Sequence, residues 1–171
     1  EAGEFDRAAE RARGHIARHP DYPPLLAAVS VLALDAEDEE LARHCAEKGG
    51  AHPDALTTLG TLTLGAMDHA GAQALFERAL SANPQSPRAW IGLGLARLAG
   101  GQSGEAGPML DRGADMFGDH LGSWVAAGWA YLLAGDHEQA RERFERARRI
   151  DPNFAESHGS LAVMDVLAGD A

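Results

Sequence analysis

The amino-acid sequence repeats itself with a period of 34 residues, and this period constrains the fold more than any other feature. Similar residues recur in step in five columns: Trp90 and Trp124; Gly60, Gly94 and Gly128; Ala72, Ala106 and Ala140; Phe76, Leu110 and Phe144; Pro84, Gly118 and Pro152. A period of this length is typical of proteins that stack one small unit repeatedly, so that neighbouring units share a continuous core. We therefore expect an array of similar units.

Each repeat contains two apolar stripes at helical spacing with a short break between them. In the repeat 121–154 one stripe holds Trp124, Ala127, Gly128 and Tyr131, and the other holds Ala140, Phe144, Ala147 and Ile150. Gly135-Asp136 separates the stripes, and Asp136 can cap the second helix, with Gln139 completing a capping-box pattern. Asp151-Pro152 ends that helix. The pattern predicts a hairpin of two helices, and the glycine and alanine columns predict that the helices approach closely.

These residues resemble the tetratricopeptide repeat. Its consensus is matched at Trp124, Ala127-Gly128, Tyr131, Ala140, Phe144, Ala147 and Pro152, and again at Leu56, Leu59-Gly60, Ala72, Phe76, Ala79 and Pro84. The resemblance implies an all-α fold, a right-handed α-solenoid of helix-turn-helix repeats whose first helices line a concave groove. The repeat 87–120 departs from the consensus, because Gly107-Pro108 and Gly113 replace helix formers in its second helix. An interior proline costs about 3 kcal/mol, so we expect this helix to start late or bend.

We expect the whole chain, residues 1–171, to form a single array. Its parts are a half repeat at 1–20, with Gly3 to Phe5, Ala8 and Ala12 on a lone second helix; a degenerate repeat at 21–52; repeats at 53–86, 87–120 and 121–154; and a half repeat at 155–171. Gly49-Gly50 is expected to end the second helix of the degenerate repeat early. The lone helices at the two ends suggest possible head-to-tail self-association, which would bury apolar residues such as Leu161, Val163, Met164 and Leu167. Because the sequence lacks an initial Met and stops at Gly169-Asp170-Ala171, we expect it to be a fragment.

The face of each first helix turned away from its hairpin partner is unusually apolar; we call it the leading-helix face. Its predicted residues are Thr57, Thr61, Leu64, Ile91, Leu95, Leu98, Val125, Trp129, Leu132 and Val163. Trp124 is predicted to pack between helices, whereas Trp129, five residues later, is predicted to line the groove. Relatives that clamp the acidic tails of chaperones carry Lys, Asn and Arg on the matching face, so the resemblance implies that this clamp is absent. An exposed apolar stripe of this size favours an apolar or amphipathic peptide or helix as partner.

A second interpretation of this face stays open, since the same residues can simply pack between neighbouring first helices. In either case the function expected is a non-catalytic protein-protein interaction scaffold. The alternative is a regulatory or localising domain of a larger enzyme, or of a membrane-anchored assembly or secretion factor, whose activity lies outside these residues.

Composition excludes several other classes. With 15 basic and 26 acidic residues the net charge is −11, which disfavours nucleic acid because phosphate binding depends on Lys and Arg. Apolar runs such as Leu25 to Leu34 are shorter than the roughly 20 residues of a membrane span, so no direct membrane insertion is expected. The single cysteine, Cys45, forms no internal disulfide and is expected to be buried and inert. A cytoplasmic location is the expectation.

No catalytic constellation, metal site or cofactor is expected. His15 and His19 have a spacing that two metal ligands can share, but they lie in the last turn of a predicted helix, where the helix dipole also favours His, and no other ligand joins them. His44 and Cys45 are adjacent and point about 100° apart on a helix, so they do not form a nucleophile and base. The basic run 141–149 alternates with Glu142 and Glu145 and is expected to form a solvated face with pairs four residues apart.

Overall fold

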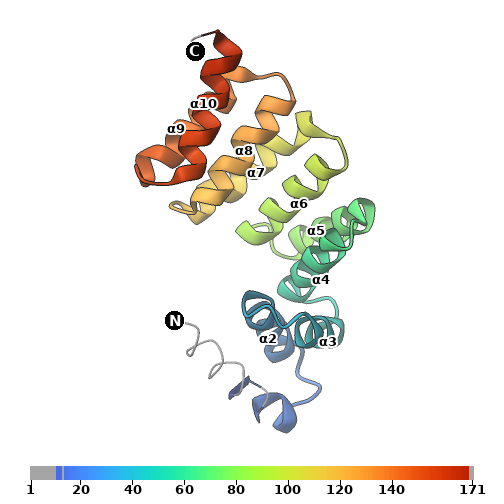
Figure 1. The fold of residues 1–171 in the computed structure, drawn as a ribbon. Coiled ribbons are helices and arrows are strands. Elements are labelled where there is room, and N and C mark those ends of the chain that lie inside the picture. The colour runs from blue at the N-terminus through green and yellow to red at the C-terminus, as the bar shows by residue number, and fades with distance from the viewer. Residues whose placement is uncertain (1–10, 13, 170–171) are drawn as a thin grey trace. The chain divides into compact units, whose positions relative to one another are not determined.

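The structure, a computed structural model, describes residues 11, 12 and 14–169, and their regular structure is entirely helical (Figure 1). The helices are α2 (Pro23–Asp35), α3 (Glu39–Gly49), α4 (Pro53–Gly65), α5 (His69–Ala82), α6 (Pro87–Ala99), α7 (Ser103–Phe117), α8 (Leu121–Leu133), α9 (His137–Ile150) and α10 (Ala155–Ala168). No strand occurs within the described ranges. The prediction of an all-α fold built from helix-turn-helix repeats is confirmed.

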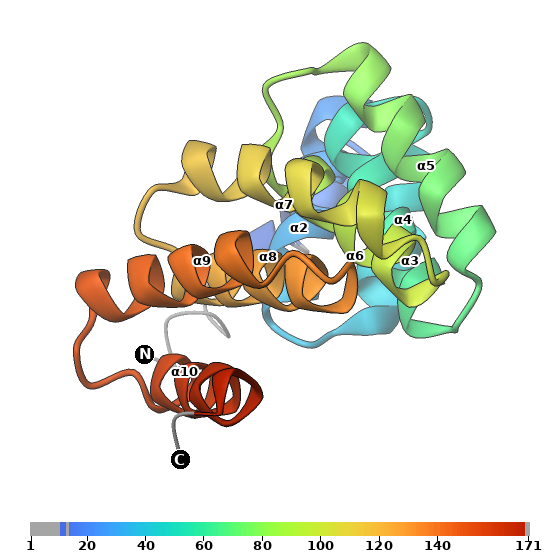
Figure 2. The same ribbon diagram turned by 90° about the horizontal axis from the view of Figure 1, so that it is seen from above.

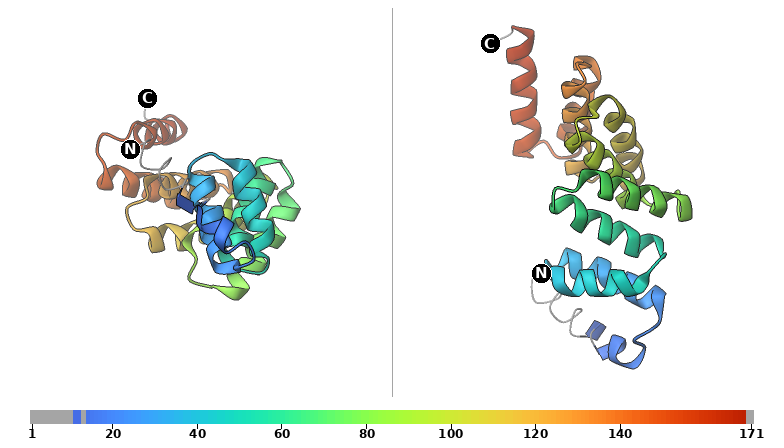
Figure 3. Two further views of the ribbon diagram at one scale, coloured as in Figure 1. Left: turned by 90° about the horizontal axis from the view of Figure 1, so that it is seen from below. Right: turned by 90° about the vertical axis from the view of Figure 1, so that its right-hand side faces the viewer.

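The chain divides into two compact units, Glu1–Gly92 and Leu93–Ala171, with the boundary inside α6. In the first unit α2 packs on α3 and α4 on α5, and both α2 and α3 contact α4. In the second unit α7 contacts α8, α8 contacts α9, and α10 contacts α9 and, less extensively, α8. Figure 2 shows the α8/α9 hairpin, and Figure 3 shows α10 as a single helix.

The turn inside each hairpin has the same backbone conformation. The backbone is left-handed at Met67, Gly101 and Gly135, with φ of 65°, 80° and 84°. After this turn the N–H of Asp136 donates to the carbonyl oxygen of Tyr131 at 2.9 Å, and its side chain accepts a hydrogen bond from the Gln139 N–H at 3.1 Å. The predicted Asp136 cap is confirmed. The backbone N–H of Asp136 bonds Tyr131, in place of the reciprocal capping-box bond expected from the Gln139 side chain.

The glycine column allows the two helices of a hairpin to approach closely, as predicted. A Cβ atom on Gly128 would lie 2.3 Å from the Phe144 ring, and one on Gly60 would lie 2.8 Å from the Phe76 ring. Both phenylalanines are fully buried. Each glycine therefore makes the space that the large side chain of the second helix fills, sixteen residues later in the sequence.

The tryptophan column has a polar role that the sequence alone did not reveal. Trp90 Nε1 donates to the carbonyl oxygen of Pro84 at 2.9 Å, and Trp124 Nε1 donates to that of Gly118 at 3.0 Å. His158, the next residue in step, bonds the Pro152 carbonyl oxygen through Nε2 at 2.6 Å. Since a carbonyl oxygen only accepts, His158 carries its hydrogen on Nε2. In each case a ring N–H ties the start of a first helix to the loop six residues earlier.

Helix α7 differs from one of the two expectations for it, the late start. It begins at Ser103, five residues before Pro108, so the expected late start is wrong. The Tyr131 ring of α8 explains why residue 107 is a glycine, because a Cβ atom at this position would lie 2.8 Å from that ring. Packing against α8 therefore holds a helix that the propensities of Gly107, Pro108 and Gly113 disfavour.

The degenerate repeat ends as its glycines predict. Helix α3 stops at Gly49, and Gly50 follows with a left-handed φ of 63°. Cys45 is fully buried, and this burial raises the pKa of its thiol, which confirms the expectation of a buried cysteine. Of the predicted N-terminal helix, Gly3 to Phe5 and Ala8 lie outside the described residues, whereas residues 14–18 are helical and Ala12 is buried against the first unit.

Candidate interaction surfaces

In the first unit, the polar groups of the predicted leading-helix face form hydrogen bonds within their own helix. Thr57 is buried, and its hydroxyl donates to the Pro53 carbonyl oxygen at 2.9 Å. Thr61 is exposed, and its hydroxyl donates to the Thr57 carbonyl oxygen at 3.1 Å. Leu64 and Ile91 are half-buried. Because Thr57 is buried and the Thr61 hydroxyl bonds its own helix, this part of the face offers a ligand mainly the Thr61 methyl group and parts of Leu64 and Ile91.

The second unit carries the larger apolar residues of the predicted face. Val125, Trp129 and Leu132 of α8 belong to one hydrophobic cluster, in which Val125 is buried and the other two are half-buried. Leu95 and Leu98 of α6 are also half-buried, and Val163 of α10 is 38% exposed. The face is thus graded, from buried at Val125 to open at Val163.

The two neighbouring tryptophans occupy different environments. Trp124 is 1% exposed, and its indole N–H is used within the fold. Trp129 is half-buried, and one side of its ring meets the Phe144 ring edge-on at a centroid distance of 5.6 Å. Trp129 therefore packs on its own hairpin partner, so it is not fully turned away from that partner as predicted, while part of its surface remains accessible.

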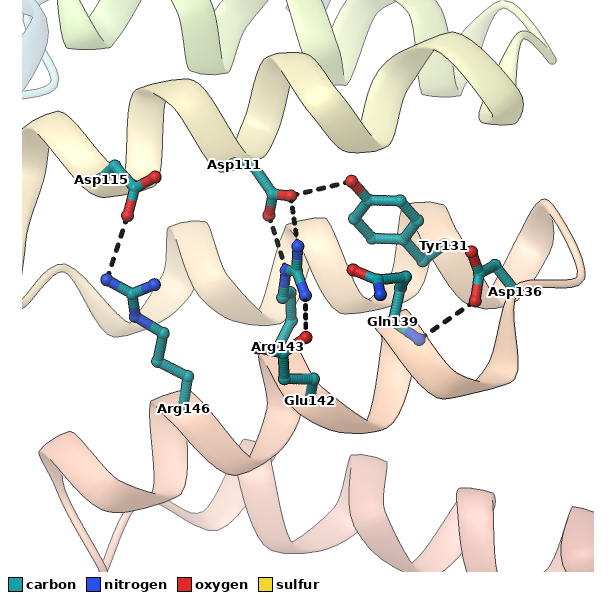
Figure 4. Close-up of polar contacts among 8 residues, drawn as sticks. All are labelled: Asp111, Asp115, Tyr131, Asp136, Gln139, Glu142, Arg143 and Arg146. Carbon is teal, nitrogen blue, oxygen red and sulfur yellow. Dashed lines mark hydrogen bonds and ion pairs between the residues drawn. The ribbon is translucent and has the colours of Figure 1, made fainter.

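A polar cluster between α7, α8 and α9 was not foreseen (Figure 4). Arg143 donates to both carboxylate oxygens of Asp111, at 2.9 and 2.7 Å, and the Tyr131 hydroxyl donates to the same carboxylate at 2.8 Å. The side chains of Arg143 and Asp111 are only 15% and 18% exposed. Burial and the bond to Asp111 raise the pKa of Tyr131 to about 12, and the bond to Asp111 raises the pKa of Arg143.

A second arginine reinforces this contact between α7 and α9. Arg146 lies over the Trp124 ring, 3.7 Å from its centroid, and pairs with Asp115 at 3.0 Å. The expectation that the run 141–149 is a solvated face is therefore wrong for Arg143, which is 15% exposed. Arg146 is 45% exposed, as expected, but it pairs with α7 and not four residues along its own helix. Glu145 and Arg149 do form such a pair, at 3.7 Å. The available signal was the spacing of Asp111 and Asp115, which share one face of α7.

We also searched the described part of the chain for metal sites and membrane-spanning helices. Across residues 11, 12 and 14–169, His, Cys, Asp and Glu nowhere gather in threes as metal ligands would. Over the same residues, each helix is either too short or too polar to span a membrane.

Comparison with known proteins places this geometry in a family. Family models described as tetratricopeptide repeat match residues 63–120 and 122–154, whereas no curated protein sequence matches. Among solved structures, MamA from Desulfovibrio magneticus RS-1 is 22% identical with a TM-score of 0.72, covering 86% of either chain. YrrB, a tetratricopeptide protein with an unusual peptide-binding site, is 18% identical with a TM-score of 0.67, covering 94% of this chain and 84% of its own.

A third structure, the first tetratricopeptide domain of Spaghetti (RPAP3) bound to an HSP90 peptide, is 16% identical with a TM-score of 0.63, covering 67% of this chain and 90% of its own. At such identities the three likenesses show the fold alone. The two family matches together span more than half of the sequence and fall on the residues that form the hairpins. The chain therefore belongs to the tetratricopeptide repeat family.

Proposed function

We propose that this chain is a non-catalytic protein-interaction scaffold that binds an apolar or amphipathic peptide or helix on its leading-helix face. Membership of the family supports a binding role, and among the similar structures YrrB has a peptide-binding site and the Spaghetti domain is bound to an HSP90 peptide. The observation that carries the proposal is that α8 and α10 each expose large apolar side chains. Leu133 and Val166 are each 66% exposed, Leu167 is 54% exposed, and Val163 is 38% exposed.

Trp129 is the anchor of the proposed surface. Its contact with Phe144 fixes one side of the ring, so the indole is already oriented when a ligand arrives and little side-chain entropy is lost on binding. Aromatic anchors at the centre of an interface contribute most of the binding energy. Truncating such an anchor costs on the order of 2 kcal/mol or more, which corresponds to roughly a 30-fold change in Kd.

Charge limits the choice of ligand. The net charge of −11 repels strongly acidic segments, and the proposed surface itself carries no charged side chain to hold a carboxylate. We therefore propose a ligand whose contacting side is apolar and whose flanks are neutral or basic. In the first unit, Thr57, Thr61, Leu64 and Ile91 form a smaller surface for which we propose weaker binding.

A display selection followed by measured affinities tests this proposal. Peptides selected from a library of amphipathic helices are titrated against the wild-type protein, Trp129→Ala and the control Ile150→Ala. Ile150 suits the control because it is also a large apolar residue, is 38% exposed, and lies on α9, which contributes no residue to the leading-helix face. The proposal predicts at least about tenfold weaker binding for Trp129→Ala and unchanged binding for Ile150→Ala.

The contrary outcome is equally specific. If Trp129→Ala unfolds at lower denaturant concentration but binds every selected peptide with wild-type affinity, Trp129 serves packing alone and the proposed surface is wrong.

A further inference from the structure

Trp129 carries an indole N–H that the fold does not use. The other two tryptophans donate theirs to backbone carbonyl oxygens, Trp90 to Pro84 at 2.9 Å and Trp124 to Gly118 at 3.0 Å. Trp129 Nε1 makes no hydrogen bond to any residue that the structure describes. Because Trp129 is only half-buried, and its nitrogen is not among the buried polar atoms that lack a partner, this N–H reaches solvent.

This N–H is also the one unused side-chain donor of the leading-helix face, all of whose residues lie in the described part of the chain. The hydroxyl hydrogens of Thr57 and Thr61 go to carbonyl oxygens of α4, at 2.9 and 3.1 Å. The other side chains of the face are those of Leu, Ile and Val, which contain no polar group. Apolar contacts have no preferred direction, so a single polar group on such a surface decides how a ligand is oriented.

Packing against α9 holds the indole ring in place. The fully buried Phe144 ring meets it edge-on, with 5.6 Å between the centroids. The direction of the Trp129 N–H is therefore set before a ligand arrives. A ligand that covered this N–H with a hydrocarbon group would remove its water and offer no acceptor in exchange, which weakens binding. A ligand that fits Trp129 must therefore present an acceptor.

The charges near Trp129 favour an uncharged acceptor. Helix α8, Leu121–Leu133, contains no charged residue. In α9, Arg143 and Arg146 are already paired with aspartates of α7. A ligand carboxylate bound here would lose water without gaining a cation.

The geometry of a helical ligand narrows the choice of acceptor further. Its backbone carbonyl oxygens are bonded within the helix, except in the last turn. Ser and Thr hydroxyls lie against their own helix, as those of Thr57 and Thr61 do in this protein. The longer Gln and Asn side chains extend an amide oxygen away from the helix, and this oxygen can accept a hydrogen bond.

We propose that Trp129 is the specificity-determining residue of the leading-helix face, and that its indole N–H donates a hydrogen bond to the amide oxygen of a Gln or Asn in the ligand. This amide stands beside the apolar side chain that packs on the ring. The inference rests on the proposed function, since it names the chemical group that the same surface selects. The bond fixes the register of the ligand along α8 and discriminates against ligands whose contacting side is wholly apolar.

A cycle of two peptides and two proteins measures this bond. The first peptide is selected against the wild-type protein from a library of amphipathic helices in which Gln occupies each position of the apolar stripe in turn; the second has Leu in place of that Gln. The second protein has Trp129 replaced by benzothienylalanine, an analogue of the same shape in which sulfur takes the place of the ring N–H. We expect the Gln peptide to bind the wild type about fivefold or more tightly than it binds the analogue protein, and the Leu peptide to bind both equally.

Nuclear magnetic resonance of the indole N–H groups gives a second readout. The Trp129 N–H, assigned by Trp129→Phe, should exchange rapidly with water in the free protein and should be protected in the complex with the Gln peptide. The same analogue at Trp124 is the matched control. It removes the bond to Gly118, so it should lower the denaturant concentration at the unfolding midpoint and leave the affinity for the Gln peptide unchanged.

The outcomes separate this inference from the proposed function. If Trp129→Ala weakens binding but the analogue protein binds the Gln peptide as tightly as the wild type, the ring acts without the bond; the inference is then wrong and the proposed function stands. If Trp129→Ala also binds with wild-type affinity, both are wrong. Equal losses of affinity for the Gln and Leu peptides on the analogue protein would overturn the inference as well, because the loss would not depend on the acceptor.

Discussion

Two surfaces in the Leu93–Ala171 unit use the same register positions, but α9 covers one and leaves the other open. On the covered surface these positions hold Trp124, Gly128 and Tyr131, whose rings and small size suit close packing. On the open surface they hold His158, Ala162 and Asp165, which tolerate water. The comparison shows that equivalent positions of the repeat can be buried or exposed. Their side chains differ accordingly, even though the 34-residue period is retained.

The largest expected difference between the two surfaces comes from removing a buried ring. Phe144→Ala leaves a cavity above Gly128 and should lower the free energy of unfolding by about 3–5 kcal/mol. Val166→Ala, at a residue that is 66% exposed on α10, should change it by no more than about 0.5 kcal/mol. Denaturant unfolding of both variants measures this, and similar losses would contradict the assignment of α9 as the covering helix.

The second largest expected difference is in the stability lost when a carboxylate is removed from each surface. Asp111→Ala leaves the largely buried Arg143 without its bidentate partner and should cost about 1–3 kcal/mol. Asp165→Ala removes a pair with Arg141 in which the side chains are 49% and 38% exposed, and should cost under about 1 kcal/mol. High salt should reduce the second loss more than the first. The reverse ranking of the two variants would show that the cluster in Figure 4 contributes little to stability.

Adding a methyl group should have opposite effects at two glycines. Gly128→Ala places a Cβ atom 2.3 Å from the Phe144 ring and should destabilise by about 1–2 kcal/mol, because the ring must move. Gly159 lies in α10 with no atom within 4 Å of the added carbon, so Gly159→Ala should stabilise by about 0.5–1 kcal/mol through helix propensity. Thermal unfolding of the two variants gives both signs. A stabilising Gly128→Ala would mean that the hairpin is looser than described.

The smallest effect concerns pH. The folded pKa of Tyr131, about 12, lies above the value near 10 of an unfolded tyrosine. A raised pKa favours the protonated phenol in the fold, so its contribution to stability is complete below about pH 10 and is lost as pH rises through about 12. Absorbance titration of the phenolate in a Tyr22→Phe background, with circular dichroism to follow folding, measures this. A midpoint near 10 in the folded protein would contradict the bond to Asp111.

Much of the fold could be predicted from the sequence because each repeat shows the same pattern of helices and small residues. The column of Gly60, Gly94 and Gly128 predicted close hairpins, and Asp136 predicted the start of α9. The early start of α7 was missed, since the propensity of Pro108 is a local property whereas the contact of Gly107 with Tyr131 is tertiary.

The polar contacts were harder to predict than the helices. The pairing of Arg143 with Asp111 depends on how α7 and α9 are rotated about their axes, which the apolar pattern fixes only coarsely. The same limit applies to Trp129. Its spacing from Trp124 predicted a different environment, but the edge contact with Phe144 depends on how α8 and α9 pack, which that spacing does not fix.

Fluorotryptophan labelling tests the central claim, that the surface at Trp129 takes a ligand while Trp124 is structural. Fluorine resonances are assigned by Trp129→Phe and Trp124→Phe, and a peptide selected against the wild-type protein is then added. We expect the Trp129 resonance to shift as the complex forms and the Trp124 resonance to stay in place. A bound peptide that leaves the Trp129 resonance unchanged would contradict it.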